Sequence, residues 1–289
     1  MNNVINEYAR SKGIIYGICD AKTLEGLDES IVNIPFFKGD IYERISPRIF
    51  LHGAKSVIVL GVKADQTPLF EGLDQIMAPS LSGVDYHKHL EGIAKELTSK
   101  MLECADFNFR IQVDSGPLIE KKFAAKAGLG FIGKNNCLIS PEFGSFFNIA
   151  LIVVDIEIEL TCSSGFLSCE DCDLCLISCP TGALGQNNKF NYNRCISYLT
   201  QKRDDLTEDE MALIGLSIYG CDICQNICPH NSHTPSQNQK EVSEKVLREI
   251  LNMDSKQFEE KFKNSNLFWR GNGVIKRNCR IVLDNLEKL

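Results

Sequence analysis

The 289-residue chain lacks any apolar run near the roughly 18 residues that a membrane-spanning helix needs. Its first residues also lack a basic region followed by an apolar stretch, so no export signal is predicted. Positive charge is scarce, because 31 Lys and Arg face 38 Asp and Glu and the net charge is −7. These absences argue against a membrane protein and against a large nucleic-acid footprint, and they indicate a cytoplasmic location.

The composition is that of a globular protein, with 44% hydrophobic and 24% charged residues. Helices and strands are expected to alternate over the first 160 residues, which indicates a layered α/β architecture. Strands are predicted at 14–19, 55–62, 109–113 and 148–159. Helices are predicted at 4–12, with Gly13 as a left-handed cap, at 85–105 and at 117–127, with Pro117 in the first turn.

Seven of the thirteen cysteines lie in two tight runs, and each run ends in Cys-Pro. The first run is Cys169, Cys172, Cys175 and Cys179, and the second is Cys221, Cys224 and Cys228. This spacing is typical of bacterial two-cluster ferredoxins, in which the last cysteine of a run ligates the other cluster. Two [4Fe–4S] clusters need eight thiolates, and Cys195 is the predicted eighth. The chain is therefore expected to carry electrons one at a time.

The crossover rule assigns the ligands of each cluster. Cluster one is predicted to use Cys169, Cys172, Cys175 and Cys228, and cluster two Cys179, Cys195, Cys221 and Cys224. Zinc is the alternative, but four-cysteine zinc sites usually present two separated Cys-x2-Cys pairs. Disulfides fit less well, since the cysteine count is odd and no export signal is seen.

Three regions follow from these patterns. Residues 1–160 form an α/β domain, residues 161–232 a ferredoxin-like domain with two clusters, and residues 233–289 a short helical C-terminal segment. Helices are expected at 193–201, at 207–216 with a capping box at Thr207, from Ser255, and at 274–286.

Asp114 directly follows the strand predicted at 109–113. Open α/β sheets place ligand chemistry at strand ends, so Asp114 could act as a general acid. Alternatively, it caps the helix expected to begin near Pro117. Nearby, Gly128, Gly130 and Gly133 match G-x-G-x-x-G, but they follow a helix rather than a strand, which argues against a dinucleotide site. They predict a turn whose backbone passes close to a large ligand or to neighbouring chain.

In these motifs and in several further segments, the chain resembles the epoxyqueuosine reductase family. That family is related to the cobalamin-dependent reductive dehalogenases. The matching segments include Asp85-Tyr86-His87, Asp114-Ser115-Gly116-Pro117-Leu118 and Gly144-Ser145, and the segments 127–135, 169–184, 194–200, 220–229, 270–271 and 277–278. They cover nearly the whole chain in the family's order and spacing.

The resemblance implies a cobalamin bound in a nitroreductase-like N-terminal α/β domain and reduced through the two [4Fe–4S] clusters. It implies reduction of epoxyqueuosine to queuosine in tRNA, with Asp114 as the proton donor and an external low-potential electron donor as partner. It also implies a cobalamin-contacting arginine near Pro47, for which Arg44 and Arg48 are both candidates. The cobalamin contacts assigned in this way are Arg48, Asp114, Gly130, Lys134, Asn135 and Ser145.

Two other functions stay open: a cobalamin and iron–sulfur reductase of the same fold that acts on a small molecule, and a non-catalytic electron-transfer or RNA-binding protein. His87 is either a surface or capping histidine or a residue facing substrate or cobalamin. Cys137 is either a small buried residue, the default for isolated cysteines such as Cys162, or a neighbour of the corrin. Lys276, Arg277 and Arg280 form either a basic face for phosphates or an ordinary solvated face.

Overall fold

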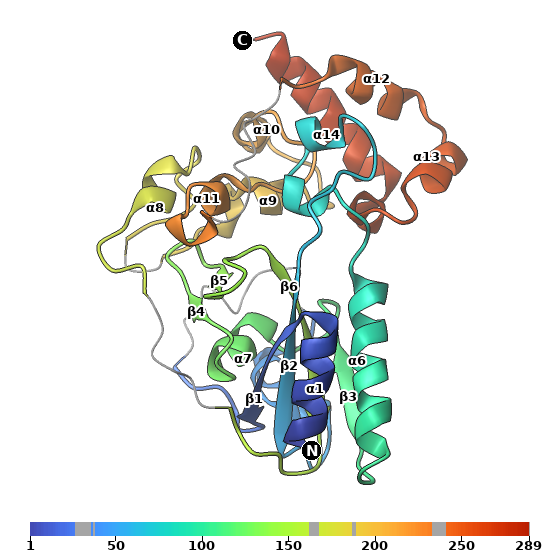
Figure 1. Cartoon of the computed structure of the whole chain (residues 1–289). Helices are drawn as coiled ribbons and strands as arrows, with labels where there is room; N and C mark the ends of the chain where they lie inside the picture. The colour runs from blue at the N-terminus through green and yellow to red at the C-terminus, as the bar shows by residue number, and fades with distance from the viewer. Residues whose placement is uncertain (27–35, 37, 162–167, 187–188, 233–240, 289) are drawn as a thin grey trace. The chain divides into compact units, whose positions relative to one another are not determined.

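The computed structural model describes residues 1–26, 36, 38–161, 168–186, 189–232 and 241–288 (Figure 1). The chain divides into two compact units. The first unit comprises Met1–Ala64 and Tyr86–Cys172, and the second comprises Asp65–Asp85 and Asp173–Leu289. Compact units and functional domains are different partitions, so the division at 160 and 232 stays a prediction. Cys162 lies outside the described residues.

The first unit is built on a four-stranded sheet in the order β1-β2-β6-β3. Its strands are β1 (Ile15–Asp20), β2 (Ser56–Lys63), β3 (Phe109–Gln112) and β6 (Phe147–Val154). Every neighbouring pair is antiparallel, with Ile58 opposite Ile152 in the centre. The four strands lie where the β-branched runs predict them, although β6 ends five residues earlier than expected.

Helices cover both faces of this sheet (Figure 1). Helices α1 (Asn2–Lys12) and α6 (His87–Leu102) pack on one face, and α7 (Glu120–Lys126) packs on the other. Successive side chains of a strand point to opposite faces, so Ile58 and Leu60 meet α1 and α6 while Val57 and Val59 meet α7. The predicted α/β layers are confirmed, and Gly13 ends α1 at φ 64° as expected.

Helix α7 begins at Glu120, three residues after the predicted start at Pro117. The loop before it wraps around the side chain of Gln112. The Gln112 amide nitrogen donates to the Leu118 carbonyl at 2.8 Å, and its amide oxygen accepts from the Leu118 N–H at 2.9 Å. The backbone of Ile119, which follows, is not helical (φ −79°, ψ 84°), so α7 begins only at Glu120.

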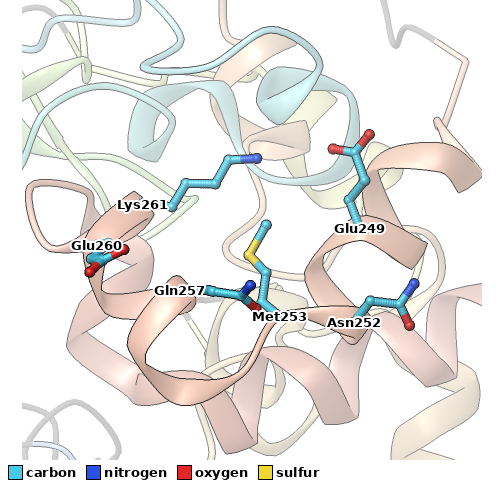
Figure 2. Close-up of a pocket in the computed structure, with 6 residues that line it drawn as sticks. All are labelled: Glu249, Asn252, Met253, Gln257, Glu260 and Lys261. Atoms are coloured by element: carbon cyan, nitrogen blue, oxygen red, sulfur yellow. The ribbon is translucent and has the colours of Figure 1, made fainter.

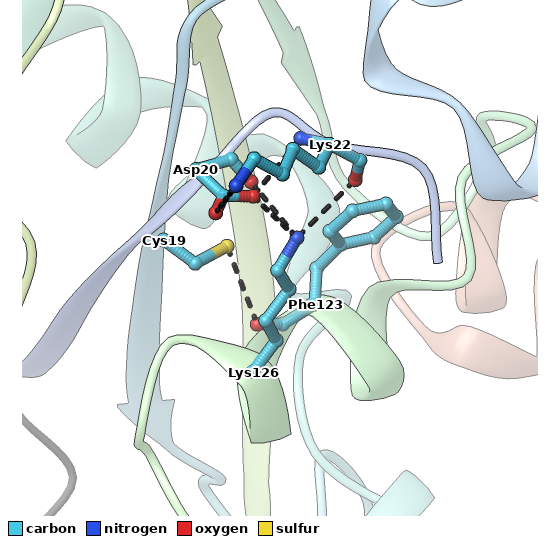
Figure 3. Close-up of polar contacts among 5 residues, drawn as sticks. All are labelled: Cys19, Asp20, Lys22, Phe123 and Lys126. Atoms are coloured by element: carbon cyan, nitrogen blue, oxygen red, sulfur yellow. Dashed lines mark hydrogen bonds and ion pairs between the residues drawn. The ribbon is translucent and has the colours of Figure 1, made fainter. Parts of the chain in front are cut away.

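A group of polar contacts joins the end of β1 to α7 (Figure 3). Lys126 Nζ lies 2.6 Å from Asp20 Oδ1 and donates to the Lys22 carbonyl at 3.2 Å. Cys19 Sγ donates to the Phe123 carbonyl at 3.9 Å, and burial raises the pKa of Cys19 to about 12. Cys19 is therefore a small buried thiol that packs the sheet against the helix.

Two shorter pieces complete the first unit. Helices α3 (Ile41–Ile45) and α4 (Pro47–Phe50) lie between β1 and β2 in the chain. Strands β4 (Phe131–Ile132) and β5 (Leu138–Ile139) pair as an antiparallel hairpin after α7.

The second unit is helical. Its α-helices are α5 (Leu73–Ile76), α8 (Leu174–Ser178), α9 (Ile196–Leu199), α10 (Glu208–Ile214), α11 (Ile223–Asn226), α12 (Glu244–Asn252), α13 (Ser255–Phe262) and α14 (Gly271–Leu286). Short 3-10 turns are η1 (Pro79–Leu81), η2 (Tyr192–Arg194), η3 (Pro229–Asn231) and η4 (Asn266–Arg270). The capping box at Thr207 is confirmed, since its hydroxyl accepts from the Glu210 N–H while Glu210 accepts from the Thr207 N–H.

The helix predicted at 193–201 is interrupted at Cys195, whose extended backbone (φ −78°, ψ 120°) separates η2 from α9. The C-terminal helices share one apolar core with α9 and α10. Buried Asn278 links α14 to the segments that contain Thr200 and Ile218. Its amide donates to the carbonyl of Thr200 at 2.7 Å and to that of Ile218 at 2.8 Å. No helix in the described ranges has the length and apolar character of a membrane span.

Candidate functional site

Asp114 and His87 come together at one end of the sheet. Asp114 Oδ2 lies 3.3 Å from His87 Nε2, and the Asp114 side chain is 55% exposed. His87 begins α6, and its ring stacks on Tyr86 with 4.4 Å between ring centroids. An exposed carboxyl group thus has an imidazole beside it and open access on its other side.

The backbone of Asp114 adopts the left-handed conformation, with φ at 55°. Aspartate tolerates this conformation better than most residues, but it still stores strain, and such strain is concentrated at functional sites. The N-cap residue of α7 is Ile119, whose side chain makes no capping hydrogen bond. Asp114 lies five residues before this N-cap, so the interpretation of Asp114 as the cap of the helix is wrong.

Glu120 lies beside this pair and was not predicted from the sequence. Its Oε1 accepts the backbone N–H of Asp114 at 2.6 Å and the side-chain amide of Gln112 at 3.2 Å. Burial of the carboxyl group, followed by the negative charge of Asp114, raises the pKa of Glu120 to about 8. At neutral pH, Glu120 is then largely a neutral carboxylic acid that holds Asp114 in place.

Glu120→Gln should flatten the pH dependence of stability. The folded-state pKa of Glu120 is raised from 4.5 to about 8, so its contribution is complete below pH 4.5 and is lost as pH rises through 8. Wild type should lose at most about 1.4 kcal/mol per pH unit from this group. Thermal unfolding midpoints measured from pH 5 to 8 test this, with exposed Glu103→Gln as the control. Parallel curves for wild type and Glu120→Gln would contradict it.

The glycine-rich segment makes its closest contacts with neighbouring chain. A Cβ placed on Gly130 would lie 2.1 Å from the Ile139 carbonyl oxygen, so only glycine fits where β4 meets β5. Of the two alternatives left open for this segment, the structure shows a close approach to neighbouring backbone. A bulky residue at Gly130 would disrupt the β4–β5 hairpin. A loss of cobalamin binding in such a variant would therefore not show that Gly130 itself contacts cobalamin.

Lys134 and Asn135 lie in the turn between β4 and β5. The backbone N–H of Lys134 donates to Cys169 Sγ at 3.4 Å, and its Nζ donates to the Glu170 carbonyl at 3.0 Å. Asn135 is buried, and its Oδ1 accepts the N–H of Cys137 at 3.1 Å. This turn therefore lies close to Cys169, the first cysteine of the first run.

The other predicted cobalamin contacts are dispersed along the first unit. Arg48 is exposed on α4, whereas Arg44 Nε donates to the carbonyls of Lys38 at 3.2 Å and Gly39 at 3.0 Å. Ser145 is partly buried just before β6. Of the two arginines, Arg48 has the more exposed side chain.

Three predicted ligands of cluster two are close enough in the second unit to interact. Burial raises the pKa of Cys221 to about 12, and the charges of Cys195 and Cys179 act in the same direction. Burial opposes ionisation of Cys179, but hydrogen bonds from the Thr181 hydroxyl and backbone N–H groups nearby lower its pKa. Neighbouring thiols with N–H donors are the environment that a [4Fe–4S] cluster requires, so these residues fit the group.

The remaining predicted ligands are placed as follows. Cys169 accepts the N–H of Cys172 at its carbonyl at 2.9 Å, Cys175 is buried on α8, Cys224 lies on α11, and Cys228 precedes η3. Among the described residues, no three His, Cys, Asp or Glu side chains form a site for a single metal ion.

The basic face considered on the last helix is largely absent. Lys276 Nζ donates to the Met253 carbonyl, and Arg277 donates to the Asp204 carbonyl at 2.7 Å. Of the three, Arg280 is exposed, whereas Lys276 and Arg277 are partly buried. The structure therefore favours internal hydrogen bonding over a phosphate-binding role for Lys276 and Arg277.

A groove of about 660 Å³ runs between α12 and α13 (Figure 2). It is lined by Glu249, Asn252, Met253, Gln257, Glu260 and Lys261. None of these residues was predicted to act in the site, and their mixed charges point to no particular ligand.

Similarity to known proteins agrees with this arrangement. A 4Fe-4S double cluster binding domain matches residues 168–231. An epoxyqueuosine reductase of Lactococcus garvieae is 36% identical over 84% of this chain and 72% of its own length. An epoxyqueuosine reductase bound to an epoxyqueuosine-modified tRNA-Tyr stem loop is 30% identical, with a TM-score of 0.86 over 99% of this chain and 81% of that chain. A Bacillus subtilis epoxyqueuosine reductase, whose catalytic aspartate loop is swung out of its active site, is 29% identical, with a TM-score of 0.83 over the same shares.

Proposed function

We propose, because the chain belongs to the epoxyqueuosine reductase family, that it reduces epoxyqueuosine to queuosine in tRNA. The observation that carries the proposal is the exposed, strained Asp114 beside His87, in the same chain as a double-cluster domain. A proton donor and an electron supply are the two things that removal of an epoxide oxygen needs.

The overall reaction consumes two electrons and two protons, converts the epoxide to an alkene, and releases the oxygen as water. Two [4Fe–4S] clusters, when bound, would supply these electrons one at a time. Cobalamin, when bound, supplies a metal centre that can be reduced to a nucleophile strong enough to open the ring. The remaining task, protonation of the departing oxygen, belongs to side chains of the chain itself.

Asp114 is the proposed general acid. Epoxide oxygen leaves poorly as an alkoxide, and a carboxylic acid within hydrogen-bonding reach removes that charge as it forms. The mostly exposed side chain of Asp114 leaves room for substrate, while His87 Nε2 at 3.3 Å can orient Oδ2 or return a proton to it. A catalytic aspartate loop in the Bacillus subtilis relative supports this assignment.

Glu120 supports the acid in two ways. Its Oε1 holds the Asp114 backbone, which fixes the direction of the carboxyl group. Because Glu120 is largely neutral near pH 7, it adds little negative charge to a site where an oxygen anion develops.

The cofactors are proposed from family membership together with the fit of the residues. Two [4Fe–4S] clusters would be held by the eight cysteines assigned above, within a ferredoxin-like region at 161–232 followed by a helical segment at 233–289. Cobalamin would bind a nitroreductase-like domain at 1–160. The proposed contacts are Arg48, Asp114, Gly130, Lys134, Asn135 and Ser145. An external low-potential electron donor would reduce the clusters. The proposed location of the protein is the cytoplasm.

A second candidate is a reductase with the same cofactors and a small-molecule substrate. The net charge of −7 and the internal bonding of Lys276 and Arg277 favour it, because phosphate contacts need free cations. The two candidates are separated by measuring the rate of conversion of free epoxyqueuosine nucleoside and of an equal amount of epoxyqueuosine-modified tRNA stem loop. Faster conversion of the stem loop supports the tRNA enzyme, and conversion of the free nucleoside alone would overturn it.

A further inference from the structure

The turn between β4 and β5 brings two nitrogen donors to the first cysteine run. This 133–137 turn presents the backbone N–H of Lys134 to Cys169 Sγ at 3.4 Å. The Lys134 ammonium reaches the next residue and donates to the Glu170 carbonyl at 3.0 Å. A hydrogen bond and a positive charge are thus fixed beside a sulfur that is a proposed cluster ligand.

The 133–137 turn is held rigidly by its own hydrogen bonds. The N–H of Gly133 donates to the Cys137 carbonyl at 2.9 Å, and the N–H of Asn136 donates to the Gly133 carbonyl at 2.8 Å. A Cβ on Gly133 would lie 2.5 Å from Ile139 Cδ1 and 3.5 Å from Cys169 Sγ. Glycine at this position therefore lets the turn pack closely against both the hairpin and the cysteine.

Lys121 anchors the turn from α7. Its Nζ donates to the Asn136 backbone carbonyl at 2.9 Å and to Asn136 Oδ1 at 2.8 Å. Asn136 is in the left-handed conformation, with φ at 62°, which two bonds from one ammonium help to maintain. Burial lowers the pKa of Lys121 to about 8, which means that burying its charged form is unfavourable. The two hydrogen bonds to Asn136 offset part of that cost.

We propose that Lys134, positioned by Lys121 through the 133–137 turn, raises the reduction potential of the cluster ligated by Cys169. Reduction adds one negative charge to the cluster and its thiolates. An N–H directed at a ligating sulfur and a nearby ammonium both stabilise the more negative state, so they make the cluster easier to reduce. The proposal rests on the proposed ligation of Cys169, and it assigns the two lysines a role separate from substrate chemistry.

The test is a redox titration of the full chain loaded with both clusters, without cobalamin or tRNA, followed by electron paramagnetic resonance. Lys134→Met removes the ammonium and keeps the backbone N–H. At a fixed potential, the ratio of reduced to oxidised cluster should fall about threefold for the cluster ligated by Cys169. This is the size of effect expected for the loss of one partly exposed charge interaction. The other cluster should be unchanged, and Lys134→Arg should resemble wild type.

Lys121→Met should shift the same cluster in the same direction by loosening the turn. Lys126→Met is the matched control, because Lys126 lies on the same helix and pairs with Asp20 instead. An unchanged potential in either Lys134→Met or Lys121→Met would overturn the proposal, as would an equal shift of both clusters. Because the titration contains no substrate, its failure leaves the proposed tRNA reaction to be tested independently.

Discussion

Asp114→Asn should slow the conversion of epoxyqueuosine to queuosine about a hundredfold or more, the low end of the range for general acid catalysis. Asparagine has the same shape and tolerates the left-handed backbone found at Asp114, but its amide cannot act as a carboxylic acid. The Asp114 side chain caps no helix, so the substitution should not unfold the protein. Single-turnover rates give the effect, and the cluster spectrum and cobalamin binding should match wild type.

Asp106→Asn is the control for this experiment. Asp106 is exposed in the loop between α6 and β3 and lies outside the group formed by Asp114, His87 and Glu120. It should turn over like wild type. Near-normal turnover by Asp114→Asn would contradict the assignment of the general acid.

Cys195→Ala should remove most of one cluster and leave the other intact. Iron and sulfide should fall from about eight of each to about four, the content of one cubane. Cys195 lies at the break between η2 and α9, close enough to Cys221 for its charge to raise the pKa of that thiol. Iron and sulfide analysis of anaerobically prepared protein measures the loss.

Cys104→Ala is the matched control, because Cys104 is exposed at the end of α6 and belongs to neither cysteine run. It should keep both clusters. If Cys195→Ala also keeps both clusters, the eighth ligand is wrong and the assignment of cluster two fails with it.

Features that depend on neighbours in the sequence were predictable. The spacing of Cys169, Cys172 and Cys175 points to a cluster because three of the four ligands of one cube come from one short loop. Gly13 ends α1 and Thr207 begins α10, each through hydrogen bonds to residues only a few positions away in the sequence. β-Branched runs mark the strands because a buried sheet requires them.

Features that depend on contacts distant in the sequence were not predictable. His87 and Asp114 are 27 residues apart, and only the fold brings them to 3.3 Å. Glu120 follows no recognised motif, since its role comes from the loop that wraps Gln112. The same loop delays the start of α7 and so removes the cap that local pattern allowed for Asp114.

The most direct test of the account is conversion of epoxyqueuosine-modified tRNA by the full chain, loaded with both clusters, under reducing and anaerobic conditions. Nucleosides released from the tRNA are quantified with and without added cobalamin. We expect queuosine to appear only when cobalamin is present and epoxyqueuosine to disappear in equal amount. Unchanged epoxyqueuosine in the presence of cobalamin, both clusters and reductant would contradict it.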